Sequence, residues 1–216
     1  HGAVMPPIYA TSTFAQPAPG QHTGYEYSRS GNPTRHALET AIADLENGTR
    51  GYAFASGLAA IATVLELLDK DSHLVAVDDV YGGTYRLLEN VRRRSAGLQV
   101  SWVKPDDLAG IEAAIRPDTR MIWVETPTNP LLKLADLSAI AAIARRHNLI
   151  SVADNTFASP AIHRPLEHGF DIVVHSATKY LNGHSDVVAG LAVVGDNAAL
   201  AEKLGYLQNA VGGVLD

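Results

Sequence analysis

Short apolar runs alternate with helical patterns along most of the chain, and this alternation constrains the fold more than any other feature. Strands are expected at 51–55, 74–77, 99–103, 121–124, 149–153 and 172–174, and helices at 56–68, 82–94, 106–115, 136–147 and 197–210. Strands that alternate with helices form parallel sheets, because each crossover helix packs back onto the sheet. The sequence therefore predicts an α/β fold, a mostly parallel sheet with helices on both faces. The apolar run at 187–194 predicts one more strand, for which an antiparallel direction is considered.

The first 47 residues stand apart from this pattern. Residues 1–30 are rich in Pro, Gly, Thr, Ser and Tyr and lack periodicity, which predicts an extended arm that could lie on another subunit. The chain is therefore divided into the arm with a first helix (1–47) and a large domain (48–216). It begins at His1 rather than Met and stops soon after Gly212-Gly213, so a fragment of a longer protein is expected.

The first helix is expected over 35–46. Asn32-Pro33 indicates a turn, and Thr34 is expected to cap the helix. Its end is expected at Asn47-Gly48, because both residues readily adopt left-handed conformations. The face that it is expected to bury consists of Leu38, Ile42 and Leu45.

Charge and composition exclude several classes of function. The 17 basic and 23 acidic residues give a net charge of −6, so no nucleic-acid surface is expected. Hydrophobic residues make up 46% and charged residues 19% of the chain, which indicates a globular protein. The absence of cysteine excludes a disulfide framework and a thiolate metal site. No apolar run reaches the roughly 18 to 20 residues of a membrane span, so no membrane partner is expected and the cytoplasm is the default location.

Polar side chains gather where the predicted strands end. Ligands of open α/β sheets bind beyond the carboxyl ends of the strands. One crevice could gather Ser56, Tyr81, Asn129, Asp154, Ser176, Thr178 and Lys179. Lys179 closely follows the strand at 172–174 and is expected to be buried, which suits covalent chemistry by a neutral amine. The plain alternative is a surface lysine that opens a loop.

Part of this set could hold a phosphate and a cation. The amides of Gly57 and Leu58 at the start of a helix could bind a phosphate, together with the hydroxyls of Ser176 and Thr178. Asp154 lies at a strand end in an apolar setting. A carboxylate there needs a cation, such as a protonated ring nitrogen.

The remaining groups suit a flat ring that carries an aldehyde. Tyr81 offers an aromatic face for stacking, and Asn129 could bond a ring hydroxyl. Lys179 offers an amine that can condense with a carbonyl. Phosphate, protonated nitrogen, flat ring and aldehyde together describe pyridoxal phosphate.

Six motifs also resemble, in order, those of one enzyme family. They are Tyr27-Ser28-Arg29 with Gly31-Asn32-Pro33-Thr34, Ser56–Ala60, Tyr81–Thr84, Glu125–Pro130, Asp154–Phe157 and Ser176–Asp186. On these motifs the chain is identified as a member of the pyridoxal-phosphate-dependent enzymes of cysteine and methionine metabolism, the trans-sulfuration enzymes. Within that family it is similar to the cystathionine γ-lyases and γ-synthases above all.

The resemblance implies a fold-type-I, aspartate-aminotransferase-like large domain in a homotetramer of close dimers. It implies that Tyr27 and Arg29 reach the cofactor phosphate of the neighbouring subunit. Lys179 would be the Schiff-base lysine and would move protons at Cα and Cβ of an amino-acid substrate, while Tyr81 would stack on the ring and transfer protons. No metal is expected. The implied cofactor-binding set is Tyr27, Arg29, Ser56, Gly57, Leu58, Tyr81, Asn129, Asp154, Thr156, Ser176, Thr178 and Lys179.

The activity implied by the resemblance is trans-sulfuration at Cγ, either cleaving cystathionine or forming it from cysteine and an O-acylhomoserine. The choice stays open, because the smaller C-terminal domain that grips the substrate carboxylate in relatives is absent from the chain. Gly83 stands where methionine γ-lyases carry cysteine, and Leu58 where acetylhomoserine sulfhydrylases carry glutamine. Both differences disfavour those two activities.

Other interpretations are weaker. A truncated cofactor-binding module without activity remains an alternative, as does cystathionine β-lyase activity. A Rossmann-type nucleotide binder would need a glycine motif after the first strand, and the chain has none. A metal site built from His175 and His184 would lack a third ligand at helical spacing.

Overall fold

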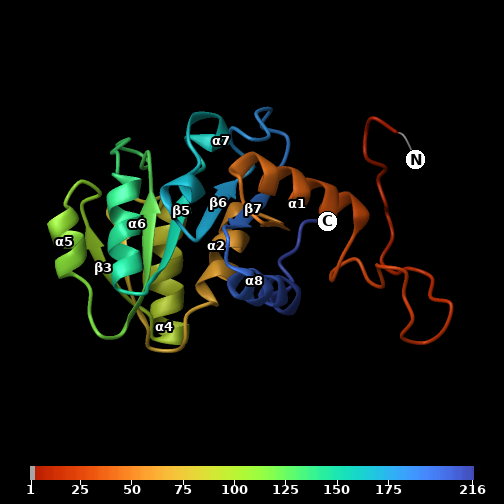
Figure 1. Ribbon diagram of the computed structural model, residues 1–216, viewed down its shortest axis with the longest axis horizontal. Coiled ribbons are helices and arrows are strands. Elements are labelled where there is room, and N and C mark those ends of the chain that lie inside the picture. Colours follow the sequence, from red (N-terminus) through yellow and green to blue (C-terminus); the bar gives the residue numbers. More distant parts are fainter. Residues whose placement is uncertain (1–2) are drawn as a thin grey trace.

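The computed structural model describes residues 3–216, so the first two positions of the predicted arm lie outside the described residues. Among the described residues, seven strands form one sheet in the order β1-β7-β6-β5-β4-β2-β3 (Figure 1). The strands are β1 (Arg50–Phe54), β2 (His73–Val77), β3 (Gln99–Val103), β4 (Thr119–Glu125), β5 (Ile150–Asp154), β6 (Ile172–Ser176) and β7 (Gly190–Val194). Strands β2 to β6 pair in parallel, whereas β7 is antiparallel to both β6 and β1. The predicted mostly parallel sheet is confirmed.

Helices cover both faces of this sheet. They are α1 (Pro33–Glu46), α2 (Gly57–Leu65), α3 (Gly82–Arg86), α4 (Arg93–Ala96), α5 (Leu108–Ala113), α6 (Leu137–Arg146), α7 (Ser159–Ile162) and α8 (Ala198–Val211), with a π-helical stretch at Leu87–Arg92 and a 3-10 helix at Pro165–His168. Strand β1 shows the layering, because Ala53 packs with α1 while Tyr52 and Phe54 pack with α2 and α8. The single helix predicted over 82–94 is divided into α3, the π-helical stretch and α4.

The central strands are apolar on both faces because helices cover both faces. In β4, for example, Met121, Ile122, Trp123 and Val124 are all fully buried. The carboxyl ends of parallel strands meet at one edge of a sheet. Since β7 runs antiparallel to β6, the start of β7 reaches that edge as well. The loops at this edge therefore come from segments far apart in sequence.

The start of α1 differs from the prediction. Asn32, and not Thr34, caps the helix, because Pro33 takes the first helical position and Asn32 Oδ1 accepts from the Thr34 amide at 2.8 Å. The Thr34 hydroxyl instead donates to the Pro7 carbonyl at 3.0 Å and accepts from the Tyr9 amide at 2.9 Å. Thr34 thus fastens the arm to α1.

The buried face of α1 also differs. Ile42 is buried as expected, but Leu38 and Leu45 are 38% and 55% exposed. Arg35 and Glu39 lie on the buried side instead. Buried charges are tolerated only where partners satisfy them, and here most of the partners come from outside the helix.

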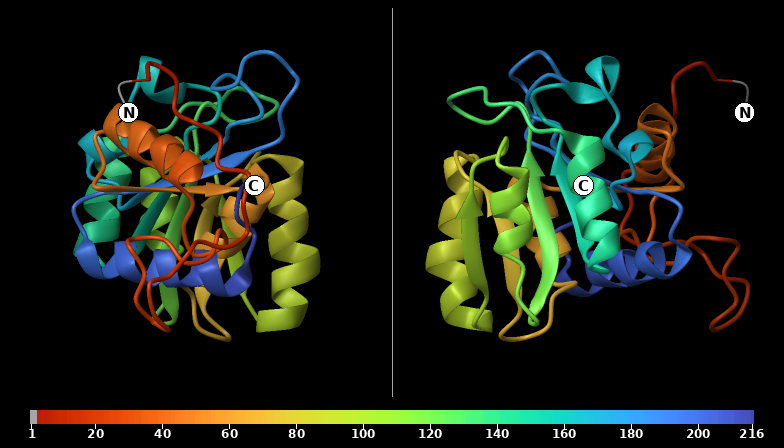
Figure 2. Two further views of the ribbon diagram at one scale, coloured as in Figure 1. Left: turned by 90° about the vertical axis from the view of Figure 1, so that its right-hand side faces the viewer. Right: turned by 60° about the vertical axis from the view of Figure 1, so that its left-hand side comes forward.

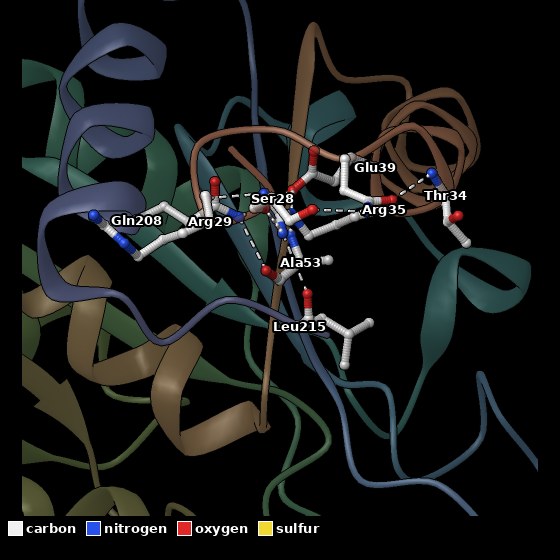
Figure 3. A network of polar contacts seen from close by, with 9 residues as sticks. Ser28, Arg29, Thr34, Arg35, Glu39, Ala53, Gln208 and Leu215 are labelled. Carbon is white, nitrogen blue, oxygen red and sulfur yellow. Dashed lines mark hydrogen bonds and ion pairs between the residues drawn. The ribbon is translucent and has the colours of Figure 1, made fainter. Parts of the chain in front are cut away.

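A buried polar network supplies those partners (Figure 3). Arg35 Nε lies 3.6 Å from Glu39 Oε1. The remaining partners are the carbonyls of Ser28, Arg29 and Leu215 for Arg35, and the Ala53 amide and the Gln208 side chain for Glu39. The network joins the arm, α1, β1, α8 and the last residues of the chain.

The arm leads away from the sheet beyond α1, as Figures 1 and 2 show in red. Between residues 3 and 32 it forms only isolated bridges, Thr13 with Tyr27 and Ala18 with Gln21. The division of the chain at residue 47 stays a prediction. Among residues 3–216, the helices are all too short or too polar to cross a membrane.

Candidate active site

A pocket of about 280 Å³ opens at the edge where the parallel strands end. Small-molecule sites span roughly 300–1,000 Å³, so the volume of this pocket lies just below that range. Most of the predicted site residues line it, namely Ser56, Gly57, Leu58, Tyr81, Asn129, Asp154, Thr156, Ser176, Thr178 and Lys179. Glu125 and Phe157 line it as well, although the sequence assigned neither a role. The sheet topology therefore brings together the polar residues that were predicted to meet at the ends of the strands.

The amino end of α2 forms one wall of the pocket. Ser56 caps the helix, with Oγ accepting from the Ala59 amide at 3.1 Å. The amides of Gly57 and Leu58 donate to no acceptor within residues 3–216. Ser176 packs against this end so closely that a Cβ added to Gly57 would stand 2.8 Å from Ser176 Cβ. Two available amides, the helix dipole and a nearby hydroxyl suit a phosphate.

Replacing Gly57 by alanine is expected to weaken binding of a phosphate-bearing cofactor about 10- to 100-fold. The added methyl group would push the start of α2 away from β6. Overpacking of this kind typically costs about 1–3 kcal/mol of free energy. The dissociation constant of pyridoxal phosphate measures the effect. Gly195→Ala is the control, because its Cβ would meet Leu166 at an ordinary 3.5 Å. Equal affinities in the two variants would contradict the assignment.

Asp154 provides a buried carboxyl at the end of β5. The amide and hydroxyl of Thr156 donate to its Oδ1, at 3.1 Å and 2.5 Å, and the same hydroxyl accepts from the Ser176 amide at 2.8 Å. Burial raises the pKa of Asp154 above its usual value. Its Oδ2 accepts no hydrogen bond from the part of the chain described here. A cationic group in the pocket would therefore find a carboxyl oxygen available.

Glu125 is the site residue that the sequence missed. It ends β4 directly opposite Asp154 on β5, and its Oε2 accepts from the Tyr81 amide at 2.8 Å. Burial, followed by repulsion from Asp154, raises the pKa of Glu125 to about 8. The pocket therefore contains two neighbouring carboxyl groups, and ionisation of one makes ionisation of the other less favourable. Only the strand order, and not the sequence spacing, reveals this pair.

Glu125 is expected to make a contribution to the stability of the cofactor-free protein that falls as the pH rises from about 5 to about 8. In that range folded Glu125 keeps a proton that the unfolded chain has released, since its pKa is raised from 4.5 to about 8. Each such group lowers the free energy of unfolding by up to about 1.4 kcal/mol per pH unit. Thermal or urea unfolding across this range measures the slope.

Glu125→Gln should flatten that pH dependence, whereas Glu202→Gln, at an exposed position on α8, should leave it unchanged. A slope that is identical in wild type and Glu125→Gln would show that Glu125 titrates normally in the folded protein.

Lys179 is exposed, contrary to the expectation that it is buried. Its amide donates to the Ser176 carbonyl at 3.1 Å in a turn that leaves the sheet, so the side chain reaches the rim of the pocket. A second hollow of about 660 Å³ shares Lys179 with the pocket. The Thr178 hydroxyl accepts from the Ala189 amide at 3.1 Å and thereby holds the segment that leads into β7.

Tyr81 lies before α3 and is 44% exposed. Its ring rests against Gly83, where an added Cβ would stand 2.3 Å from the ring carbon Cε1. A cysteine at position 83, as methionine γ-lyases carry, would displace this ring. Glycine at position 83 therefore leaves room for the Tyr81 ring.

Tyr27 and Arg29 do not line this pocket. Arg29 donates to the carbonyl and the side-chain oxygen of Asn209, at 2.7 Å and 2.9 Å, and its guanidinium lies 5.4 Å from the Tyr27 ring centroid. Arg35 holds the backbone carbonyl of Arg29, as Figure 3 shows. Their predicted contact with a neighbouring subunit stays a prediction.

The two histidines considered for a metal site lie in different surroundings. His175 is buried on β6 and contacts Glu46, whereas His184 is exposed and lies 2.8 Å from the Asn182 carbonyl. The close grouping of three metal-ligating side chains that such a site needs does not occur among residues 3–216.

Comparisons with known proteins agree with the geometry of the pocket. Residues 1–216 match the family model described as "Cys/Met metabolism PLP-dependent enzyme". The chain belongs to this family. A cystathionine beta-lyase of Coxiella burnetii is 63% identical over 213 residues, which are 99% of this chain and 55% of that protein. A probable cystathionine gamma-synthase of Herpetosiphon aurantiacus is 53% identical over 213 residues, 99% of this chain and 66% of that protein.

A solved structure extends the likeness to the fold. The crystal structure of cystathionine gamma-lyase from Lactobacillus plantarum, complexed with L-serine, gives a TM-score of 0.96 at 54% identity. The match covers 99% of this chain and 55% of that one, so the chain spans about half the length of that relative. The predicted family and fold type I are confirmed.

The cofactor of the family is pyridoxal phosphate, and the pocket fits this molecule on its own geometry. The α2 amides suit the phosphate, the buried Asp154 suits a protonated ring nitrogen, and Lys179 at the rim offers an amine that could condense with the aldehyde. The names of the relatives include β-lyase, γ-lyase and γ-synthase, and what these activities share is trans-sulfuration chemistry.

Proposed function

We propose that the protein containing this chain is a pyridoxal-phosphate-dependent trans-sulfuration enzyme that acts at Cγ of an amino acid, cleaving or forming cystathionine. The observation that carries the proposal is the meeting of Lys179, Asp154 and the amino end of α2 in one pocket. Relatives named for cystathionine cleavage and synthesis support the substrate class.

The side chains of the pocket would divide the work among them. Bound pyridoxal phosphate supplies an aldehyde that condenses with amines and a ring that accepts electrons from the substrate. The α2 amides and the Ser176 hydroxyl would hold the phosphate, and Asp154 would hold the ring nitrogen protonated. Lys179, which lines both the pocket and the second hollow beside it, would move protons at Cα and Cβ of the substrate.

Two further groups would orient the ring. Tyr81 would stack on the cofactor ring and exchange protons with the substrate or leaving group. The phenol ring of Tyr81 rests against Gly83, and the Tyr81 amide donates to the Glu125 carboxyl. The side chain of Asn129 donates and accepts no hydrogen bond within residues 3–216 and lines the pocket, so it could bond the ring hydroxyl.

The product of cystathionine distinguishes the possible reactions. Cleavage at Cγ and cleavage at Cβ each take up one water. The first yields cysteine, 2-oxobutanoate and ammonia, and the second yields homocysteine, pyruvate and ammonia. A γ-synthase would instead form cystathionine from cysteine and an O-acylhomoserine, with release of the acyl group as a carboxylate. We expect cysteine as the thiol product or cystathionine synthesis. Homocysteine with pyruvate as the main products would contradict action at Cγ and would leave the cofactor assignment intact.

We also propose a homotetramer of close dimers, in the cytoplasm, in which Tyr27 and Arg29 complete the neighbour's site. The arm that carries them extends beyond α1 (Figure 1), and Arg35 fixes its backbone at Ser28 and Arg29. An arm held at its base can present two side chains to a second copy.

Co-expression of Arg29→Ala with Lys179→Ala subunits tests this arrangement. In a mixed dimer, one site would combine both defects and the other would have neither, so about a quarter of wild-type activity should return at equal mixing. Each variant alone should be nearly inactive. If mixing restores nothing beyond the sum of the two variants, Arg29 does not act across subunits.

A cofactor-binding module without turnover is the second candidate, because the chain spans only 55% of the Coxiella relative. Activity of the complete gene product with cystathionine decides against it. Cofactor binding without any turnover of cystathionine or acylhomoserines would favour it.

A further inference from the structure

A buried polar cluster lies behind the pocket and has no role in the function proposed above. It consists of Glu46 at the end of α1, Asn155 directly after β5 and His175 on β6. All three residues are almost completely buried. Glu46 Oε1 lies 2.5 Å from His175 Nε2 and accepts from Asn155 Nδ2 at 3.0 Å. One carboxylate oxygen thus joins three elements that are distant in sequence.

The cluster is not expected to contribute much to the stability of the fold. A buried ion pair contributes little unless its remaining polar atoms are satisfied. Within the described part of the chain, Glu46 Oε2, Asn155 Oδ1 and His175 Nδ1 have no hydrogen-bond partner. Well-packed apolar side chains would hold α1 against the sheet at least as well, so the charges point to another role.

Asp154 is the functional group beside this cluster. Asn155 follows it directly, and the Asn155 amide donates to the Val174 carbonyl at 3.0 Å. Asp154 also pairs with Val174 in the sheet, one residue before His175. His175 lines the same pocket as Asp154. The cluster therefore adjoins Asp154 in two ways. Asn155 follows Asp154 in the chain, and His175 follows the residue that pairs with Asp154 in the sheet.

The electrostatics favour a coupling between the two. Burial raises the pKa of Asp154, while the nearby His175 lowers it. The titratable groups that face His175 are Glu46 from α1, Asp154 from β5 and His163 after α7. Of these, only Glu46 contacts the imidazole at hydrogen-bond distance.

We propose that Glu46, Asn155 and His175 are positioning residues for Asp154. The Glu46 carboxylate holds the Asn155 amide and the His175 imidazole in place. These contacts fix the ends of β5 and β6 beside Asp154, so that its carboxyl is oriented toward a protonated ring nitrogen. The inference deepens the proposed function and rests on Asp154 facing the nitrogen of pyridoxal phosphate.

Glu46→Gln and His175→Gln in the complete gene product test the proposal. Each removes one partner of the contact between Glu46 and His175 with little change in volume. His73→Gln is the matched control, because His73 is also a buried histidine on a strand but contacts Thr119 and Ser101, outside the pocket. Two readouts besides turnover are used: the ¹⁵N chemical shift of labelled pyridoxal phosphate in the site, which reports protonation of its ring nitrogen, and the cofactor dissociation constant.

In wild type and His73→Gln we expect a protonated ring nitrogen at pH 8. In Glu46→Gln and His175→Gln we expect a shift toward the unprotonated nitrogen and a dissociation constant raised about tenfold, which corresponds to about 1.4 kcal/mol. Folded variants with the wild-type nitrogen shift and affinity would overturn the proposal. An unprotonated nitrogen in the wild type would instead remove the role given to Asp154, so the two failures are distinguishable.

A second measurement keeps the proposal open to disproof if both variants fail to fold. The ¹⁵N spectrum of histidine-labelled wild-type protein should show a hydrogen on His175 Nε2, because the Glu46 carboxylate oxygen can only accept at their 2.5 Å contact. A His175 Nε2 without a hydrogen would overturn the proposal.

Discussion

Replacing Lys179 by alanine should lower turnover of the complete enzyme by at least about 10²- to 10⁴-fold, the usual contribution of one proton-transferring group. The true loss should be larger, because the variant also lacks the amine that condenses with the cofactor. Stability should change little, since Lys179 is exposed and its ammonium group makes no hydrogen bond or ion pair within residues 3–216. Steady-state rates and thermal unfolding measure the two effects.

Lys70→Ala is the control for this substitution. Lys70 is exposed and lies 3.8 Å from Asp71, away from the pocket. It should retain wild-type turnover. A Lys179→Ala enzyme with wild-type rates would remove Lys179 from the reaction, however well its position fits.

Asp154→Asn should lower turnover about 10²- to 10³-fold, the range observed when one preorganised electrostatic group is removed from an active site. The amide is nearly isosteric, but it cannot balance the charge of a protonated ring nitrogen. The cofactor-free variant should nevertheless be at least as stable as wild type at pH 8. Burial raises the pKa of Asp154, and the substitution removes a carboxylate that is costly to ionise there.

A substitution that lowers turnover without lowering stability distinguishes a functional aspartate from a structural one. Asp171 is the matched control, because it directly precedes β6 and accepts from the amide and hydroxyl of Ser151 at 2.8 Å and 2.7 Å. Asp171→Asn should lower stability and leave turnover unchanged. If Asp154→Asn lost stability and kept its rate, Asp154 would be a structural residue.

The sequence was sufficient to predict the sheet and most of the pocket, because both follow from local patterns. Apolar runs define the strands, and ligands of α/β sheets bind where strands end. Ser56, Asp154 and Lys179 could therefore be grouped without coordinates. The antiparallel direction considered for the strand at 187–194 is confirmed in β7, although its apolar run alone does not determine the direction.

Features that depend on distant partners were missed. Arg35 and Glu39 lie on the buried face of α1 because Leu215 and Gln208, about 170–180 positions away, satisfy them. The opposition of Glu125 to Asp154 requires the strand order, and no spacing in the sequence contains it.

The expected burial of Lys179 was wrong for a related reason. The apolar strand before it is buried, but the turn after Ser176 carries the lysine out to the rim. The contact between Glu46 and His175 spans 129 positions, and only the packing of α1 against the sheet creates it.

Borohydride reduction of the complete gene product with pyridoxal phosphate, followed by peptide mapping, tests the central claim most directly. Reduction fixes the bond between the cofactor and its lysine, so the modified residue can be identified by mass. A phosphopyridoxyl group confined to Lys179 is the predicted result. A protein that carries no such group, or carries it only on another lysine, would contradict the assignment of this pocket as the active site.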